Sequence, residues 1–158
     1  LQKKNPFLTV LNSIALLILL SNWIFSLYVF PELPEKIPVH FDGAGEADRF
    51  GPKFMYFILP ALASFLFAIM TFVNRYPRFL EYAKAVTKED DNSGYTASTQ
   101  LLHVMKIAVM IVLAAIQVLT YTTVTKRSDG LGGWFLPITL GILLLPLAVF
   151  LIRSRLNK

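Results

Sequence analysis

Apolar side chains occur in four long runs along the chain, each about 18 to 24 residues long and free of ionised groups. A helix needs about 20 consecutive apolar residues to cross the hydrocarbon core of a bilayer. The runs therefore predict four transmembrane helices, at about 7–30, 54–73, 101–124 and 134–152. We expect an all-α integral membrane protein, in which residues 1–158 form a single membrane domain and the four helices pack in one bundle.

The composition agrees with this class. Hydrophobic residues make up 55% of the chain and charged residues 16%, whereas a soluble domain has about 45–50% apolar and about 25% charged residues. The first run is longer than the apolar core of a secretory signal and is followed by no small-residue cleavage site, so we expect it to remain as a membrane anchor.

The net charge of +5 and the sequence pI near 9.6 have a simple explanation in a membrane protein. Basic residues concentrate in cytoplasmic loops and so set the orientation of the helices. Nine Lys and Arg residues flank the spans on the side of the two termini, and five lie on the other side. The sequence therefore predicts a multi-pass protein of the cell membrane, with both termini in the cytoplasm, and no nucleic-acid partner.

The connector 31–53 follows the first span and is expected to face the outside. It reads PELPEKIPVHFDGAGEADRFGPK and carries acids, Gly and Pro at high density. Within it Ile37, Val39 and Phe41 alternate with polar residues, a strand-like pattern that would pack one face onto the bundle. We expect an ordered extracellular loop between the first two helices.

Four side chains of this connector form a candidate metal site: His40, Asp42, Glu46 and Asp48. Gly45 permits a sharp turn that would bring Glu46 and Asp48 back towards His40 and Asp42. Imidazole and carboxylate groups suit a divalent metal, although the spacing matches no established metal motif. His40 with Asp42 could equally form a general base with its orienting acid, but the connector contains no Ser or Cys nucleophile. The alternative is a structural cap whose polar groups bond one another.

The connector also follows a family pattern, which in words is LP, then IP-x-H-aromatic-Asp/Asn, a Gly, an Asp/Asn and a closing Lys. The matching residues are Pro34, Ile37, Pro38, His40, Phe41, Asp42, Gly45, Asp48, Phe50 and Lys53. This pattern resembles the signature loop of a bacterial multi-pass membrane domain of unknown function, which also forms the N-terminal part of the sporulation-delaying-protein (Sdp) immunity family. The resemblance implies a role in protecting a cell against a membrane-active peptide toxin and in signalling its presence.

Two amides lie inside the spans at similar depth. Asn22 and Gln117 are each about 11–12 Å below the outer ends of their helices, at 1.5 Å per residue. An amide in a membrane helix should point inward and find a partner. One hypothesis is an outward-opening polar pocket, lined by these amides and roofed by His40, Asp42 and Asp48. The alternative is that both amides bridge helices.

The inner side of the predicted bundle carries two further features. Residues 75–88 have one apolar helical face and predict an amphipathic segment on the inner membrane surface. His103 and Lys106 lie one turn apart at the start of the third span. They could form an anion site, or Lys106 could extend its ammonium group to the lipid headgroups.

The sequence therefore favours a binding module over an enzyme and assigns no catalytic residue. The candidate ligand-binding residues are His40, Asp42, Gly45, Asp48, Lys53, Asn22 and Gln117. The expected partners are the lipid bilayer and a peptide toxin or another membrane protein, and a divalent metal at the outer loop is the one cofactor that the pattern suggests. A metal-dependent membrane enzyme or a transporter accessory subunit, using the same loop, is the alternative.

Overall fold

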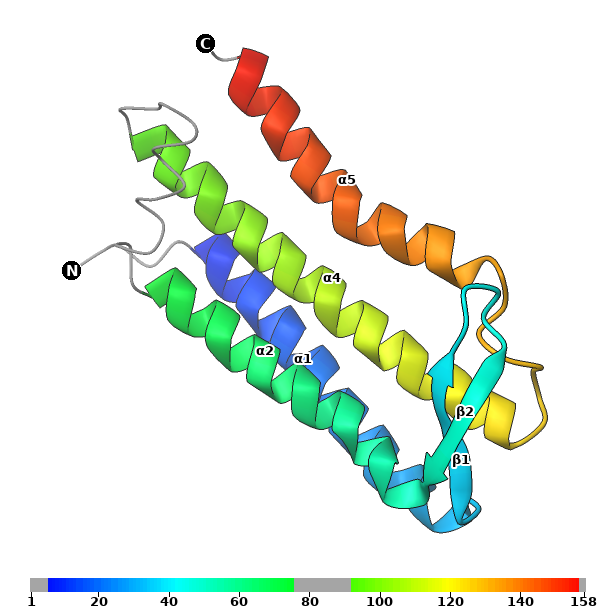
Figure 1. The fold of residues 1–158 in the computed structure, drawn as a ribbon. Helices are drawn as coiled ribbons and strands as arrows, with labels where there is room; N and C mark the ends of the chain where they lie inside the picture. Colours follow the sequence, from blue (N-terminus) through cyan, green and yellow to red (C-terminus); the bar gives the residue numbers. More distant parts are fainter. Residues whose placement is uncertain (1–5, 76–91, 157–158) are drawn as a thin grey trace.

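The computed structural model describes residues 6–75 and 92–156, and four of its helices are long and apolar enough to cross a membrane. The helices run side by side, with the start of α1 and the end of α5 at one end of the bundle and a β-hairpin at the other (Figure 1). The helices are α1 (Pro6–Val29), α2 (Ile58–Arg75), α4 (Asn92–Val124) and α5 (Phe135–Leu156).

The ends of these helices differ from the apolar runs that predicted them. α4 begins at Asn92 rather than near residue 101, because polar residues continue the helix beyond its membrane-crossing part. α2 is preceded by a short 3-10 helix, η2 (Lys53–Phe57). Hydropathy marks the stretch that bilayer lipids can cover, and it carries little information on where a helix ends. The predicted inner amphipathic segment, 75–88, lies outside the described residues except for Arg75.

α4 is the central helix and packs against α1, α2 and α5. The shared core of α1, α2 and α4 contains the small residues Ala15 and Ala63, which let the helices approach closely, together with Leu19, Met110 and Leu113. α5 lies beside α4 and away from α1 and α2 (Figure 1). Most side chains of α5 are exposed, so the surrounding lipid would cover a large part of its surface.

A polar layer joins three elements near the hairpin end of the bundle. The fully buried Gln117 donates from Nε2 to the Ser26 hydroxyl at 2.9 Å and to the Tyr56 carbonyl oxygen at 3.0 Å. The Tyr56 hydroxyl in turn donates to the Gln117 carbonyl oxygen at 2.9 Å. Because lipid offers no competing partners, these bonds tie α1, η2 and α4 together.

A second polar layer lies near the end of the bundle opposite the hairpin. It contradicts the alternative in which Lys106 extends to the lipid headgroups. Lys106 is fully buried, so it does not extend its ammonium group to the headgroups. Its Nζ donates to Asn12 Oδ1 at 2.6 Å and to Thr71 Oγ1 at 3.1 Å, and lies 4.8 Å from the centre of the Phe67 ring. One lysine of α4 therefore connects α1 and α2 from inside the bundle.

The connector between α1 and α2 forms a two-stranded antiparallel sheet, which adds a small β-hairpin to the expected helical bundle. β1 (Lys36–Phe41) pairs with β2 (Ala47–Pro52), with irregular register on both sides of His40. The proline at position 38 lacks an N–H, which suits an edge or an irregular point of a sheet. Ile37 is buried on the cluster of Val29, Leu33 and Tyr56, whereas Val39 remains 40% exposed.

The tip of the hairpin is bonded to the turn between α4 and α5. The Leu131 N–H donates to the Gly45 carbonyl oxygen at 2.8 Å, and Glu46 forms a β-bridge with Gly130. Gly45 has a φ of +83°, and a Cβ there would lie 2.6 Å from the Gly132 carbonyl oxygen. Glycine is therefore required at position 45 both for the backbone conformation and for the close approach of the two turns.

The orientation of the bundle can be tested by cysteine labelling, since the chain has no native Cys. Glu35→Cys and Asp129→Cys should react with an impermeant maleimide in intact cells, and Asp91→Cys should react only after permeabilisation, because the excess of basic residues predicts inner termini. Labelling of Asp91→Cys alone in intact cells would reverse the orientation.

The contact between the two turns predicts that Gly45→Ala opens the hairpin tip. Left-handed strain of about 1 to 3 kcal/mol and the backbone clash should break the bond to Leu131, and hydrogen–deuterium exchange at residues 128–134 should become faster. Gly43→Ala is the control, because a Cβ at Gly43 meets no atom within 4 Å. Equal exchange in both variants would contradict this role for Gly45.

The polar layer at Gln117 predicts that Tyr56→Phe lowers the free energy of unfolding by about 1 kcal/mol, the net contribution of one buried hydrogen bond. Unfolding by SDS in mixed micelles would measure the change. Tyr28→Phe is the matched control, because Tyr28 is 75% exposed and surface changes stay within about 0.5 kcal/mol. Equal losses in the two variants would exclude a stabilising role of the buried hydroxyl.

Candidate functional site

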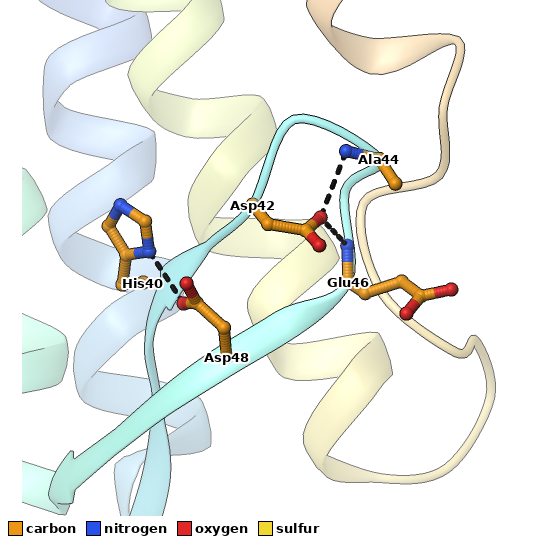
Figure 2. A network of polar contacts seen from close by, with 5 residues as sticks. All are labelled: His40, Asp42, Ala44, Glu46 and Asp48. Atoms are coloured by element: carbon orange, nitrogen blue, oxygen red, sulfur yellow. Dashed lines mark hydrogen bonds and ion pairs between the residues drawn. The ribbon is translucent and has the colours of Figure 1, made fainter.

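The candidate site residues of the connector have different roles in the hairpin (Figure 2). Asp42 is part of the turn: its Oδ1 accepts hydrogen bonds from the backbone N–H groups of Ala44 and Glu46, each at 2.9 Å. The Asp42 N–H donates to the Glu46 carbonyl oxygen, and the Gly45 N–H donates to the Asp42 carbonyl oxygen. A hydrogen bond from the backbone N–H two residues later to an Asp carboxylate is a common way to fix a turn. The Asp42 carboxylate is therefore occupied in holding the turn.

His40 and Asp48 form an exposed cross-strand pair. His40 Nδ1 lies 2.5 Å from Asp48 Oδ1, and the two side chains are 47% and 43% exposed. The hydrogen bond from His40 holds the pKa of the Asp48 carboxyl below its usual value, so this carboxylate is ionised at neutral pH. An ionised carboxylate only accepts hydrogen bonds, and Nδ1 must therefore carry the proton.

This tautomer fixes what the histidine ring can offer to a ligand. Within the described residues, no hydrogen bond involves His40 Nε2. When Nδ1 carries the single proton of the neutral ring, Nε2 presents a lone pair and accepts a hydrogen bond. Because the ring is half-exposed, a donor from outside the protein can reach this atom.

Lys53 closes the base of the connector rather than facing the His40–Asp48 pair. Its Nζ lies 2.9 Å from a Glu35 carboxylate oxygen and 5.6 Å from the centre of the Phe30 ring. Its backbone N–H also donates to the Glu35 carbonyl oxygen at 3.0 Å. The side chain and the backbone of Lys53 thus hold together the two ends of the connector.

Asn22 and Gln117 lie in the bundle, separate from the hairpin pair. Gln117 bridges helices through Ser26 and Tyr56, as described above, while both side-chain polar atoms of the buried Asn22 and the Oε1 atom of Gln117 have no hydrogen-bond partner. Three cavities lie around the hairpin, and neither amide lines any of them. The structure thus places the amides and the hairpin pair at two distinct sites.

The four candidate metal ligands do not converge. Of these, only His40 and Asp48 contact each other, while Asp42 faces the turn amides and the Glu46 carboxylate points away (Figure 2). Across residues 6–75 and 92–156, no three His, Asp or Glu side chains gather closely enough to hold a metal ion. The described side chains therefore offer two donors at the hairpin.

The cavities bring together residues that the sequence did not group with one another. An open groove of about 610 Å³ lies between the hairpin and the end of α4, and charged side chains of both signs line it, among them Lys36, Glu46, Lys126 and Asp129. A smaller cavity of about 140 Å³ lies under β1 and includes Thr120. The sequence gives no local signal for either, because residues that are distant along the chain form their walls.

The matching family model covers the hairpin and parts of its flanking helices. Residues 17–63 match the family described as "Domain of unknown function (DUF1648)". A protein of Archaeoglobus fulgidus, described as an uncharacterized protein, is 41% identical over 78 residues, which is 44% of this chain. The alignment covers 41% of that relative, so this chain spans less than half of its length. No solved structure matches the chain. The family resemblance thus lies in the segment that carries the His40–Asp48 pair.

Proposed function

We propose that this protein is a binding module of the cell membrane, whose hairpin recognises a membrane-active peptide on the outer side, in an immunity or sensing role. The observation that carries this proposal is the exposed His40–Asp48 pair on a hairpin that other residues hold in place. Asp42 fixes the turn, Gly45 joins the turn to α5, and Lys53 closes the base. An exposed polar pair of this kind contributes little to stability, so the pair is free to serve a ligand.

A peptide is the class of ligand that the hairpin suits best. β1 packs against α4 and η2, which leaves β2 as the outer strand of a two-stranded sheet. An extended peptide can add a strand to such an edge through main-chain hydrogen bonds. Nε2 of His40 would accept from a peptide N–H, and Phe50, which is 63% exposed on β2, offers an apolar contact.

The groove beside the hairpin supports the same class of ligand. It contains both Lys and Glu or Asp side chains, so it complements a chain that carries charges of both signs. Its volume of about 610 Å³ can hold several side chains. The enzyme and transporter alternatives require a converging set of metal ligands or an ion path, and no described feature favours either of them.

The proposal predicts that His40→Ala and Asp48→Asn reduce protection against membrane-active peptides. Cells that express the full chain should tolerate a higher concentration of at least one member of a peptide panel. Each variant should lower that concentration about five- to tenfold, the effect of losing one hydrogen bond between neutral groups. The measurement is the inhibitory concentration of each peptide, at equal amounts of protein in the membrane.

Gly43→Ala provides the control, since a side chain at Gly43 enters open space on the same hairpin. It should retain full protection. Identical survival of the wild type, His40→Ala and Asp48→Asn across the panel would exclude a role of the pair in peptide recognition.

A further inference from the structure

The cavity under β1 is enclosed mainly by apolar side chains. Its roof is β1, its sides are η2 and the start of α2, and its floor is α4. Val39 and Ile58, which lie at its border, are 40% and 50% exposed, so the surface next to the cavity is apolar. Ile58 is the first residue of α2, which places the entrance near the outer boundary of the membrane. The lining comprises Ile37, Pro38, Val39, Phe41, Met55, Tyr56, Ile58, Leu59, Ile116 and Thr120.

One hydroxyl group in this lining lacks a partner. Thr120 is 4% exposed, and its hydroxyl makes no hydrogen bond to any residue in the described parts of the chain. Thr122 and Thr123, which follow it on α4, each donate to the Leu119 carbonyl oxygen, three or four residues earlier. A hydroxyl that borders a mostly apolar cavity without a protein partner can form a hydrogen bond with a polar atom bound there.

Water is a poor occupant of this space. A buried water usually needs two to four polar partners. Among the lining side chains only Thr120 and Tyr56 carry a polar group, and the Tyr56 hydroxyl is already bonded to Gln117. An alkyl chain would fill the volume but would leave Thr120 unpaired. The occupant must therefore be mostly apolar and carry one hydrogen-bonding atom.

The volume of the cavity indicates the size of the apolar part of its occupant. Its volume of about 140 Å³ is close to that of an engineered protein cavity, about 150 Å³, which binds benzene. Phe41 and Tyr56 offer ring edges and faces, and the Met55 sulfur is a favourable neighbour of an aromatic ring. We propose that this cavity binds a single aromatic ring that carries a hydroxyl group, a phenol, with the hydroxyl bonded to Thr120.

Two sources can supply a phenol ring at this depth: a tyrosine side chain of a bound peptide or a free membrane-soluble phenol. The first source rests on the proposed function, because the hairpin that would hold the peptide is also the roof of the cavity. The second does not depend on it.

Methyl NMR of the full chain in micelles tests the site. The chain has four methionines, Met55, Met70, Met105 and Met110, of which Met55 lines the cavity. With ¹³C-methyl methionine, 4-methylphenol should shift the Met55 signal saturably and leave the buried Met110 signal in place. Toluene, which has the same ring without the hydroxyl, should bind about fivefold more weakly, as expected for the loss of one hydrogen bond.

Three variants separate the cavity from general partitioning into the micelle. Thr120→Val should remove the preference for 4-methylphenol over toluene, since it keeps the shape and deletes the hydroxyl. Ile116→Phe should fill the cavity and abolish the Met55 shift, whereas Ile111→Phe, at a position 43% exposed on the same helix, should preserve it. A Met55 shift that does not saturate, or that persists in Ile116→Phe, would overturn the proposal.

Titration with acetyl-Leu-Tyr-Leu-amide, and with the same peptide in which Phe replaces Tyr, identifies the source of the ring. A saturable Met55 shift that is stronger with the Tyr peptide assigns the ring to a peptide, and a shift with 4-methylphenol alone assigns it to a free phenol. His40→Ala should leave the 4-methylphenol shift unchanged, so failure of peptide protection and failure of the cavity remain distinguishable.

Discussion

One backbone hydrogen bond, from the Leu131 N–H to the Gly45 carbonyl oxygen, organises the hairpin end of this protein. It joins the tip of the hairpin to the turn before α5, and glycines on both sides let the two backbones meet. α5 packs mainly beside α4 among the helices described, and this contact connects its N-terminal turn to the hairpin as well. The same hairpin contains β1, which contacts α4 and covers the cavity at Thr120.

The residues of the family pattern divide between those that fix the connector and those that remain exposed on the hairpin. Asp42, Gly45 and Lys53 are the residue types of a ligand site, yet in the structure they fix a turn, a close approach and the base of a loop. Because these three residues fix the hairpin, His40 and Asp48 can remain exposed. Among the described contacts, their side chains bond each other and support no other part of the fold. Under the proposed function, this support would lower the entropy cost of binding, because the loop is already ordered in the free protein.

The interior of the bundle uses polar groups as fixed connections between helices. Lipid does not drive apolar helices together, and hydrogen bonds between helices supply part of the association energy. Lys106 is an extreme case, because a buried ammonium group is costly unless oxygen atoms and ring faces surround it. Asn12, Thr71 and Phe67 provide that environment, each from a different turn of α1 or α2. The surroundings of the Lys106 Nζ atom thus come from two helices that are distant from it along the chain.

The sequence by itself determined the membrane class, the four helical spans and the location of the family pattern, because bilayer thickness and hydropathy act on consecutive residues. It also indicated extended structure at Ile37 to Phe41, since strand alternation is local. Only the tertiary structure decided that β1 pairs with β2, that Asp48 rather than Asp42 is the partner of His40, and that Lys106 lies inside the bundle. It also revealed the unpaired hydroxyl of Thr120 and the bond between Gly45 and Leu131. These features depend on contacts between segments that are far apart in sequence. The packing of the whole bundle determines which of these groups meet, and no local sequence pattern carries that information.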